Sequence, residues 1–204
     1  MQEFTDRQIE IMEAATNRIS KYGIQNLTIK TLAEDIGLSE PALYRHFKSK
    51  NEILLSVLEY FKMEMKSRIQ SIQFKEDDSY AERLRLIFNS QLQTFTAKPA
   101  IVSVIFAESI FHFDENLSNK VAEIMDLMQN YVLENVKNGQ ENGQYSKVIG
   151  ASTLTTIIIG GMRMTVLKWK LSGHKSNLMK DGKSVLNGIL KMTENKNYKY
   201  ERSY

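Results

Sequence analysis

Residues 28–50 read TIKTLAEDIGLSEPALYRHFKSK, and two short helices with a turn between them can be recognised there. Apolar residues recur at helical spacing from a start at Thr28, and Gly37 stands just past the end of that helix, where a positive φ is favoured. Ser39 can cap the second helix, and Pro41 fits its first turn because no backbone donor is needed there. The pattern predicts a helix-turn-helix.

The second helix of this motif would bury Leu43 and Phe47, which lie four residues apart on one face. Its other side chains face outward, and a helix laid in a DNA major groove presents such side chains to base edges and phosphates. The predicted DNA contacts, which include residues just before and after this helix, are Thr28, Lys30, Ser39, Glu40, Pro41, Ala42, Tyr44, Arg45, His46, Lys48 and Lys50.

Roles within this surface follow from side-chain chemistry. Arg45 has the donor geometry to bind guanine O6 and N7, and Glu40 can accept from cytosine N4, although a carboxylate is repelled by the DNA backbone. Contacts to phosphates are assigned to Tyr44, His46, Lys48 and Lys50.

The run from Leu27 to Leu55 resembles the DNA-binding region of the TetR family of bacterial repressors. The matching residues are the small residue and glycine of the turn, a Leu-Tyr-x-His-Phe run and the lysine after it: Ala33, Gly37, residues 43–47 and Lys50. We therefore expect an all-α fold, with a three-helix helix-turn-helix DNA-binding domain and a helical ligand-binding and dimerisation domain. The predicted bounds are residues 1–48 and 49–195, followed by a polar tail over 196–204.

Bulk composition is consistent with a cytoplasmic protein that has no membrane partner. The 204 residues suit one small and one larger domain, and the absence of cysteine excludes disulfides and thiolate metal sites. The first six residues include two acids and no apolar run follows, so no signal peptide is expected. The most apolar stretch, 154–171, is interrupted by Arg163, Lys168 and Lys170, which predicts a buried helix and not a membrane span.

The total charge does not by itself indicate nucleic acid. The net charge is +3, and the first fifty residues contain seven basic and seven acidic side chains. Placement is more informative, because Lys30, Arg45, His46, Lys48 and Lys50 cluster around the proposed recognition helix.

Helical periodicity continues along the rest of the chain. A capping box of Thr5 and Gln8 predicts a helix that ends near Tyr22. Further helices are predicted over about 49–72, 79–95, 99–111, 117–138, 146–171 and 178–192. The helix that begins near Ser49 would bridge the two domains, so a shift at its far end could re-aim the DNA-binding unit.

Aromatic and methionine side chains of the midsection have two interpretations, because each could simply fill a core. Gln91, Glu108 and Thr155 would be costly to bury without partners, so the whole set suits an apolar pocket with a few orienting polar groups. The TetR resemblance also implies an effector site there. The residues assigned to a small, largely apolar effector are Phe61, Met65, Phe88, Gln91, Phe95, Phe106, Glu108, Met125, Met128, Tyr131, Thr155 and Trp169.

The last two helices are predicted to form a homodimer interface, since small residues interrupt an apolar helix and permit close approach. The interface residues assigned are Gly160, Gly161, Val185, Leu186 and Ile189. The alternative is that both helices pack only within their own subunit.

Catalytic patterns were not found: there is no cysteine, no glycine-rich phosphate loop and no His-Glu-x-x-His spacing. The run His112 to Glu115 could offer metal ligands, but a helix end with solvated acids is the favoured interpretation. We therefore expect neither an enzyme nor a cofactor or metal. The predicted function is a ligand-released repressor that binds a palindromic operator; the alternative is a helical small-molecule-binding or scaffold protein whose DNA-binding unit has lost or changed its role.

Overall fold

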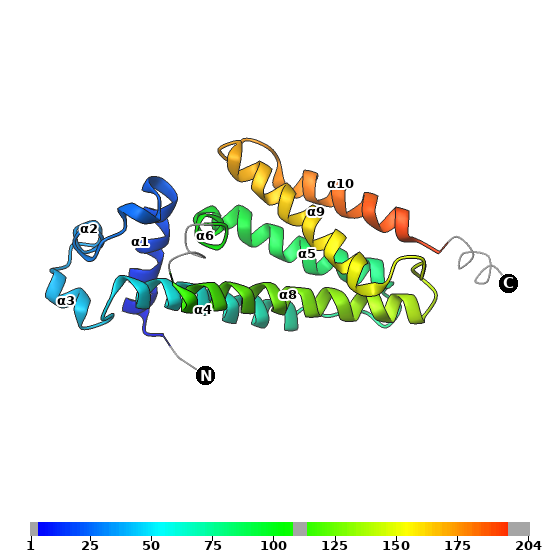
Figure 1. Cartoon of the computed structure of the whole chain (residues 1–204), viewed down its shortest axis with the longest axis horizontal. Helices are drawn as coiled ribbons and strands as arrows, with labels where there is room; N and C mark the ends of the chain where they lie inside the picture. The colour runs from blue at the N-terminus through cyan, green and yellow to red at the C-terminus, as the bar shows by residue number, and fades with distance from the viewer. Residues whose placement is uncertain (1–3, 108–113, 196–204) are drawn as a thin grey trace. The chain divides into compact units, whose positions relative to one another are not determined.

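The computed structural model describes residues 4–107 and 114–195, and these form helices joined by short connections (Figure 1). Within these ranges the single strand-like pairing is an isolated bridge between Tyr145 and Glu194. The all-α prediction is confirmed. The helices are α1 (Asp6–Tyr22), the 3-10 turn η1 (Ile24–Asn26), α2 (Ile29–Asp35), α3 (Glu40–Tyr44), α4 (Lys50–Gln70), α5 (Tyr80–Ala97), α6 (Pro99–Ile105), α8 (Glu115–Glu141), α9 (Ala151–Leu171) and α10 (Leu178–Thr193).

The chain divides into two compact units. The first unit comprises Met1–Met65 and Lys98–Ile124, and the second comprises Lys66–Ala97 and Met125–Tyr204. Helices α4 and α8 each continue from one unit into the other. The domain boundary predicted after residue 48 was placed at the end of the DNA-binding motif, and the division into two compact units does not test it. It stays a prediction. The predicted tail over 196–204 lies outside the described residues.

In the first unit, α1 packs against α6 and α2. The capping box predicted at its start is present, with Thr5 Oγ1 accepting from the backbone of Gln8 and the Gln8 side chain accepting from Thr5. The helix ends at Gly23, whose φ of +81° is easily adopted only by glycine. Both ends therefore form where the local sequence predicts.

Four charged side chains connect α4 to α8 in the first unit. Glu59 accepts from Lys120 at 2.8 Å, and Lys62 donates to Glu123 at 2.7 Å. Burial alone would raise the pKa of Glu59, but hydrogen bonds and charge from Lys120 and Lys62 outweigh it and hold that pKa below its ordinary value. The network orients two helices that contribute to both units.

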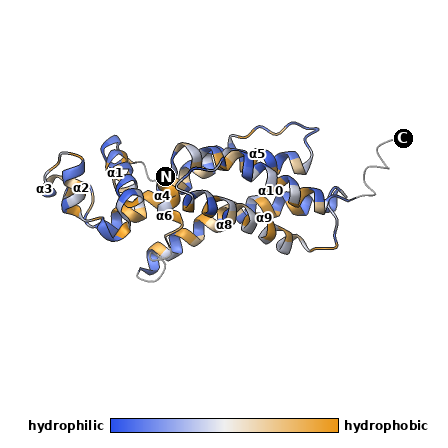
Figure 2. Cartoon of the chain, turned by 90° about the horizontal axis from the view of Figure 1, so that it is seen from above, coloured by the Kyte–Doolittle hydropathy of each residue, from blue (hydrophilic) through white to orange (hydrophobic). Residues whose placement is uncertain are grey.

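In the second unit, α10 packs against both α9 and α5 (Figure 1). Gly182 allows this approach, because a Cβ added there would lie 2.5 Å from Leu92 Cδ1. Figure 2 shows α9 as a largely hydrophobic helix, in keeping with buried residues such as Leu154, Ile158 and Val166. None of the described helices combines the length and the unbroken apolar character that a membrane span needs.

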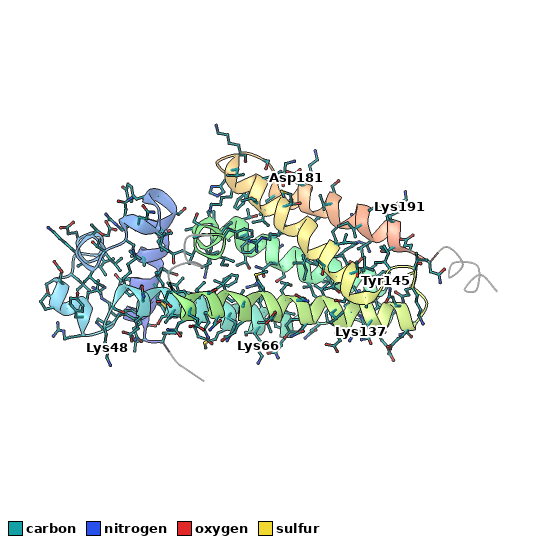
Figure 3. The ribbon with its side chains drawn as sticks, in the orientation of Figure 1. Lys48, Lys66, Lys137, Tyr145, Asp181 and Lys191 are labelled. Carbon is teal, nitrogen blue, oxygen red and sulfur yellow. The ribbon has the colours of Figure 1, made fainter. Side chains whose placement is uncertain are left out.

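Helix α8 continues past Asn138 to Glu141 with Gly139 inside it, so of the turn pairs Asn138-Gly139 and Asn142-Gly143 only the second marks its end. A Cβ at Gly139 would lie 2.4 Å from Tyr145 Cδ2, so the glycine makes room for a ring that is only 2 % exposed. Figure 3 shows Tyr145 beside the region where α8 ends and α9 begins. The reversal occurs later, at Gly143, which has a φ of +74°.

Two other boundaries also differ from the sequence prediction. Helix α9 begins at Ala151 and not at Ser146, because the Gln140 amide donates to the carbonyls of Ser146 and Ile149 at 2.8 and 2.7 Å and holds that segment as a loop. Helix α6 ends at Ile105, and residues 108–111 of the predicted helix lie outside the described residues.

Replacing Gly139 with Ala should lower the free energy of unfolding by about 1–3 kcal/mol, because the added methyl group overlaps the buried Tyr145 ring. Gly188→Ala is the matched control, since it is also helical but a Cβ there meets no described atom within 4 Å. It should leave stability unchanged or raise it by up to about 1 kcal/mol. Chemical denaturation of both variants checks this, and equal effects would contradict it.

Candidate DNA interface

Helix α2 has a capping box at its start and a glycine just after its end. Thr28 Oγ1 accepts from the backbone of Thr31 at 3.1 Å, and the Thr31 hydroxyl accepts from the backbone of Thr28 at the same distance. Gly37 has a φ of +64°, a conformation that costs a non-glycine residue free energy. The predicted helix-turn-helix is therefore present with its expected glycine.

Helix α3 is short, with five residues from Glu40 to Tyr44. Ser39 caps it, as predicted, by accepting from the backbone of Ala42 at 3.3 Å. Leu43 and Phe47 are 0 % and 2 % exposed, so the predicted inward face is confirmed. The helix therefore presents the residues on its opposite face to solvent.

Most of the predicted DNA contacts lie on the surface. Tyr44 is 50 % exposed although it is aromatic, and Arg45 beside it is also exposed. The exposed contacts are Thr28, Lys30, Ser39, Glu40, Pro41, Tyr44, Arg45 and Lys48, and the half-buried ones are Ala42, His46 and Lys50.

Lys48 and Lys50 occupy different environments. Lys48 is exposed and projects away from the ribbon between α3 and α4 (Figure 3), while its backbone N–H donates to the Glu52 carboxylate. Lys50 is half-buried, and its Nζ donates to the carbonyl of Ile24 at 2.8 Å. Burial lowers the pKa of Lys50. One of its three donors is used by the protein backbone, and its role as a phosphate contact stays a prediction.

Arg18 is a positioning residue that the sequence analysis missed. Its guanidinium donates to both carboxylate oxygens of Asp35 at 2.7 and 2.8 Å and to the carbonyl of Asn26 at 3.0 Å. It therefore joins α1 to η1 and α2. Arg18 and Asp35 are 17 residues apart in different helices, so no local spacing indicates the pair.

The residues predicted for the effector site fall into both units. Phe61 and Met65 are buried in the first unit, where Phe106 is half-buried. In the second unit, Phe88, Gln91, Phe95, Thr155 and Trp169 are buried, and Met128 and Tyr131 are half-buried. Met125 is 45 % exposed, so its assignment stays a prediction, and Glu108 lies outside the described residues.

The two described polar residues of that set differ in their hydrogen bonding. Gln91 Oε1 accepts from Arg68 Nη2 at 2.6 Å, and Arg68 Nε donates to Ser90 Oγ at 3.0 Å. Thr155 is fully buried, and its hydroxyl has no hydrogen-bond partner among the described residues. Gln91 is therefore satisfied by its own subunit, whereas Thr155 is not.

The residues predicted for the dimer interface are only partly on the surface. Leu186 and Ile189 are 3 % and 8 % exposed within one subunit, and a Cβ at Gly161 would lie 3.0 Å from Ile189 Cδ1. The assignment of these two side chains to a subunit interface is corrected, because they are buried within their own subunit. Val185 is half-buried, and Gly160 is exposed.

Both carboxylate oxygens of Asp114 have protein partners. Its Oδ1 accepts from the backbones of Asn116 and Leu117 at 2.9 and 3.1 Å, so it caps α8. Its Oδ2 accepts from Asn51 at 2.6 Å. The described residues contain no group of three or more His, Asp or Glu side chains placed to hold a metal ion. His112 and Phe113 lie outside the described residues.

Two sequence profiles of known families match the chain. Residues 11–57 match the profile described as bacterial regulatory proteins, tetR family, and residues 61–192 match the C-terminal region of YsiA-like proteins. The chain belongs to the TetR family. It is a DNA-binding regulator and not an enzyme, and its TetR helix-turn-helix profile covers the exposed residues of α3.

A TetR-family chain of known role also resembles it in sequence. The nucleoid occlusion factor SlmA of Vibrio vulnificus is 28 % identical over 126 residues, which cover 61 % of this chain and 64 % of that protein. The match therefore spans less than two thirds of the relative's length.

Solved TetR-family structures resemble the fold. The fatty acid degradation regulator FadR from Bacillus halodurans gives a TM-score of 0.80 at 20 % identity, covering 93 % of this chain and 97 % of that one. FadR from Bacillus subtilis in complex with stearoyl-CoA gives a TM-score of 0.73 at 20 % identity, covering 89 % and 97 %. At this identity the likeness establishes the fold alone.

Arg45→Ala should weaken binding to the specific operator by about 1–3 kcal/mol and relax the preference at one base pair, because a bidentate base contact is lost. Gel shifts on DNA from upstream of the protein's own gene, with each base pair varied in turn, measure both effects. Non-specific affinity should fall less. Unchanged operator affinity would contradict the assignment of Arg45.

Lys48→Ala should weaken binding to all sequences alike and reduce the slope of log affinity against log salt by about one unit, since one phosphate contact is lost. Lys50→Met keeps the aliphatic stem but removes the donor to Ile24, so it should mainly lower thermal stability. Salt titrations and thermal melts of both variants separate the roles. A reversed pattern would mean that Lys50, and not Lys48, contacts phosphate.

Proposed function

We propose that this TetR-family chain is a homodimeric transcriptional repressor that binds a palindromic operator in the cytoplasm and releases it when a small, largely apolar molecule binds. The observation that carries this proposal is the exposed face of α3. Leu43 on its buried face and Phe47 just after the helix anchor it in the core, while Tyr44, Arg45 and the nearby Lys48 are exposed. A capped, well-anchored helix with an exposed arginine suits major-groove recognition.

The effector is proposed to occupy the apolar interior of the second unit. Phe88 and Phe95 are buried in the second unit, and the unpaired hydroxyl of the fully buried Thr155 suits a ligand that supplies one hydrogen bond. Stearoyl-CoA is the first compound to test, since a FadR of the same fold was solved with it. Its long acyl chain suits an apolar lining.

Two helices are placed to transmit an effector signal. Helix α4 begins two residues after Lys48 and runs without interruption into the second unit. Helix α6 packs against α1, which Arg18 joins to the helix-turn-helix. A ligand that favours another position of either helix would bias the DNA-binding helices, provided it binds the released conformation more tightly.

The release mechanism is tested by gel shifts with and without effector. Native mass spectrometry identifies any small molecule that co-purifies, and that molecule and stearoyl-CoA are then added to the operator complex. We expect dissociation of the complex at increasing effector concentration. An operator complex that persists when the protein is saturated with a bound small molecule would overturn ligand-released repression, while leaving DNA binding intact.

Gln91→Leu and Phe61→Ala separate ligand response from stability. Gln91 accepts from Arg68, so its replacement removes this charge-assisted hydrogen bond and should lower stability by about 1–3 kcal/mol. If Gln91 also orients the effector, operator binding should persist but release should fail. Phe61→Ala, in α4, should decouple ligand from DNA in the same way. If both variants release the operator at the effector concentration that releases the wild-type protein, neither Gln91 nor Phe61 contributes to the effector site.

Self-association is proposed through an exposed apolar stripe on α9. Ile157, Met164 and Leu171 follow one another at seven-residue intervals and are 43 %, 55 % and 76 % exposed, with Gly160 between the first two. Such spacing places them on one side of a helix, as in helix pairs that associate through a seam. A second copy of this helix is the proposed partner, and a dimer would match two operator half-sites about 34 Å apart.

Met164→Lys should convert dimers to monomers that still fold, because it places a charge within the proposed seam. Gln129→Lys, at an exposed position of α8, is the control and should stay dimeric. Ile189→Asp should instead unfold the subunit, since that side chain is buried. Light scattering and circular dichroism distinguish these outcomes, and a folded, dimeric Met164→Lys variant would place the interface elsewhere.

A second candidate function is a DNA-bound factor that acts through a protein partner and not through transcription. The sequence similarity to SlmA, a nucleoid occlusion factor, favours it. Chromatin immunoprecipitation distinguishes the two: a repressor should occupy a few promoter sites, whereas a nucleoid-associated factor should occupy many sites across the chromosome. Unchanged transcription after deletion of the gene would also favour the second candidate.

A further inference from the structure

A groove of about 330 Å³ lies in the second unit, formed by residues of α4, α5, α8 and the loop after α4. Ile69, Ile87 and Tyr131 supply an apolar lining, and Arg83 and Asn135 supply polar groups. Its volume is at the lower end of the range found for small-ligand sites. Of the proposed effector residues, only Tyr131 lines it.

Asn135 is the first feature of this groove that calls for a ligand. The residue is 8 % exposed, and its Oδ1 is buried and accepts no hydrogen bond from the described residues. Buried side-chain acceptors are almost always satisfied, because an unmet acceptor loses its bonds to water without replacement. Oδ1 is covered in this structure, so an N–H or O–H donor that enters the groove would satisfy Asn135 after a rotation of its amide group toward the groove.

Arg83 is the second feature, and it is independent of the first. Its guanidinium carbon lies 5.4 Å from the centre of the Phe74 ring and 5.1 Å from that of Tyr80. These rings hold the guanidinium in place, yet its buried Nε has no acceptor and the side chain makes no ion pair in the described part of the chain. A positioned guanidinium with free donors is suited to a planar carboxylate.

We propose that this groove binds a small, mostly apolar carboxylic acid that carries a separate N–H or O–H donor. The carboxylate accepts from Arg83, the donor is received by Asn135 Oδ1, and the apolar body packs on Ile69, Ile87 and Tyr131. A single positive side chain with Glu134 at the exposed rim suits a monoanion and disfavours a phosphate. The groove is also too small for a long acyl chain.

Isothermal titration of the full chain with indole-3-acetate tests the proposal, because this probe combines a carboxylate, a flat apolar ring and an N–H. Two relatives remove one feature each: 1-methylindole-3-acetate lacks the donor, and 3-methylindole lacks the carboxylate. We expect saturable binding of indole-3-acetate that weakens at least about tenfold for each relative. No saturable binding, or equal binding of all three probes, would overturn the proposal.

Variants assign the binding to this groove. Arg83→Gln and Asn135→Leu should each weaken indole-3-acetate binding at least about tenfold, whereas Arg85→Gln, whose arginine already pairs with Glu82 and Asn187, should not. Asn135→Leu should keep or raise the melting temperature, because it removes an unmet polar group. A lower melting temperature with unchanged binding would make Asn135 a packing residue and overturn its role.

Ligand binding in this groove is independent of the proposed repressor function. Operator affinity and release by the effector should be unchanged in Arg83→Gln, because that residue is not part of the DNA interface or the proposed effector lining. A failed gel shift with stearoyl-CoA would therefore count against ligand-released repression, and a failed titration with indole-3-acetate against this groove.

Discussion

The DNA-binding surface depends on the burial of one face of a helix that is too short to be stable by itself. Five residues form little more than one helical turn, and an isolated helix of that length does not persist in water. Helix α3 exists because Leu43 and Phe47 are almost completely buried and Ser39 caps its first turn. Its exposed residues are therefore held by the core beneath them and not by helix propensity.

Contacts between helices also hold the motif in place, and Arg18 makes several of them. Arg18 binds Asp35 and the carbonyl of Asn26 together, so α1, η1 and α2 are held in one arrangement. Lys50 has a similar role from the other side of the motif, because its ammonium group binds the carbonyl of Ile24. Basic residues near a DNA-binding helix thus divide into those that hold the protein together and those, such as Arg45 and Lys48, that remain exposed.

Small residues in the second unit serve its own packing. Gly139 accommodates Tyr145, and Gly182 accommodates Leu92, at distances that no Cβ would permit. Apolar side chains are left on the outside of α9, where Met164 and Leu171 are more than half exposed. The last two helices thus pack closely within their own subunit and also leave an apolar stripe on its surface. These two properties are separate, although both require small and apolar residues in the sequence.

Local sequence by itself determined the helical fold class, the TetR helix-turn-helix, the caps at Thr5 and Ser39, and the inward residues Leu43 and Phe47. These features depend on spacings of three or four residues, which the linear sequence contains directly.

Only the tertiary structure decided which polar and small residues have partners. It showed that Arg68 donates to Gln91, that Lys50 donates to the carbonyl of Ile24, and that the Tyr145 ring lies against Gly139. It also placed Ile189 inside the subunit. Each of these depends on residues that meet across different elements of the fold. Periodicity identifies the face of a helix that is apolar, but it carries no information about which neighbour covers that face.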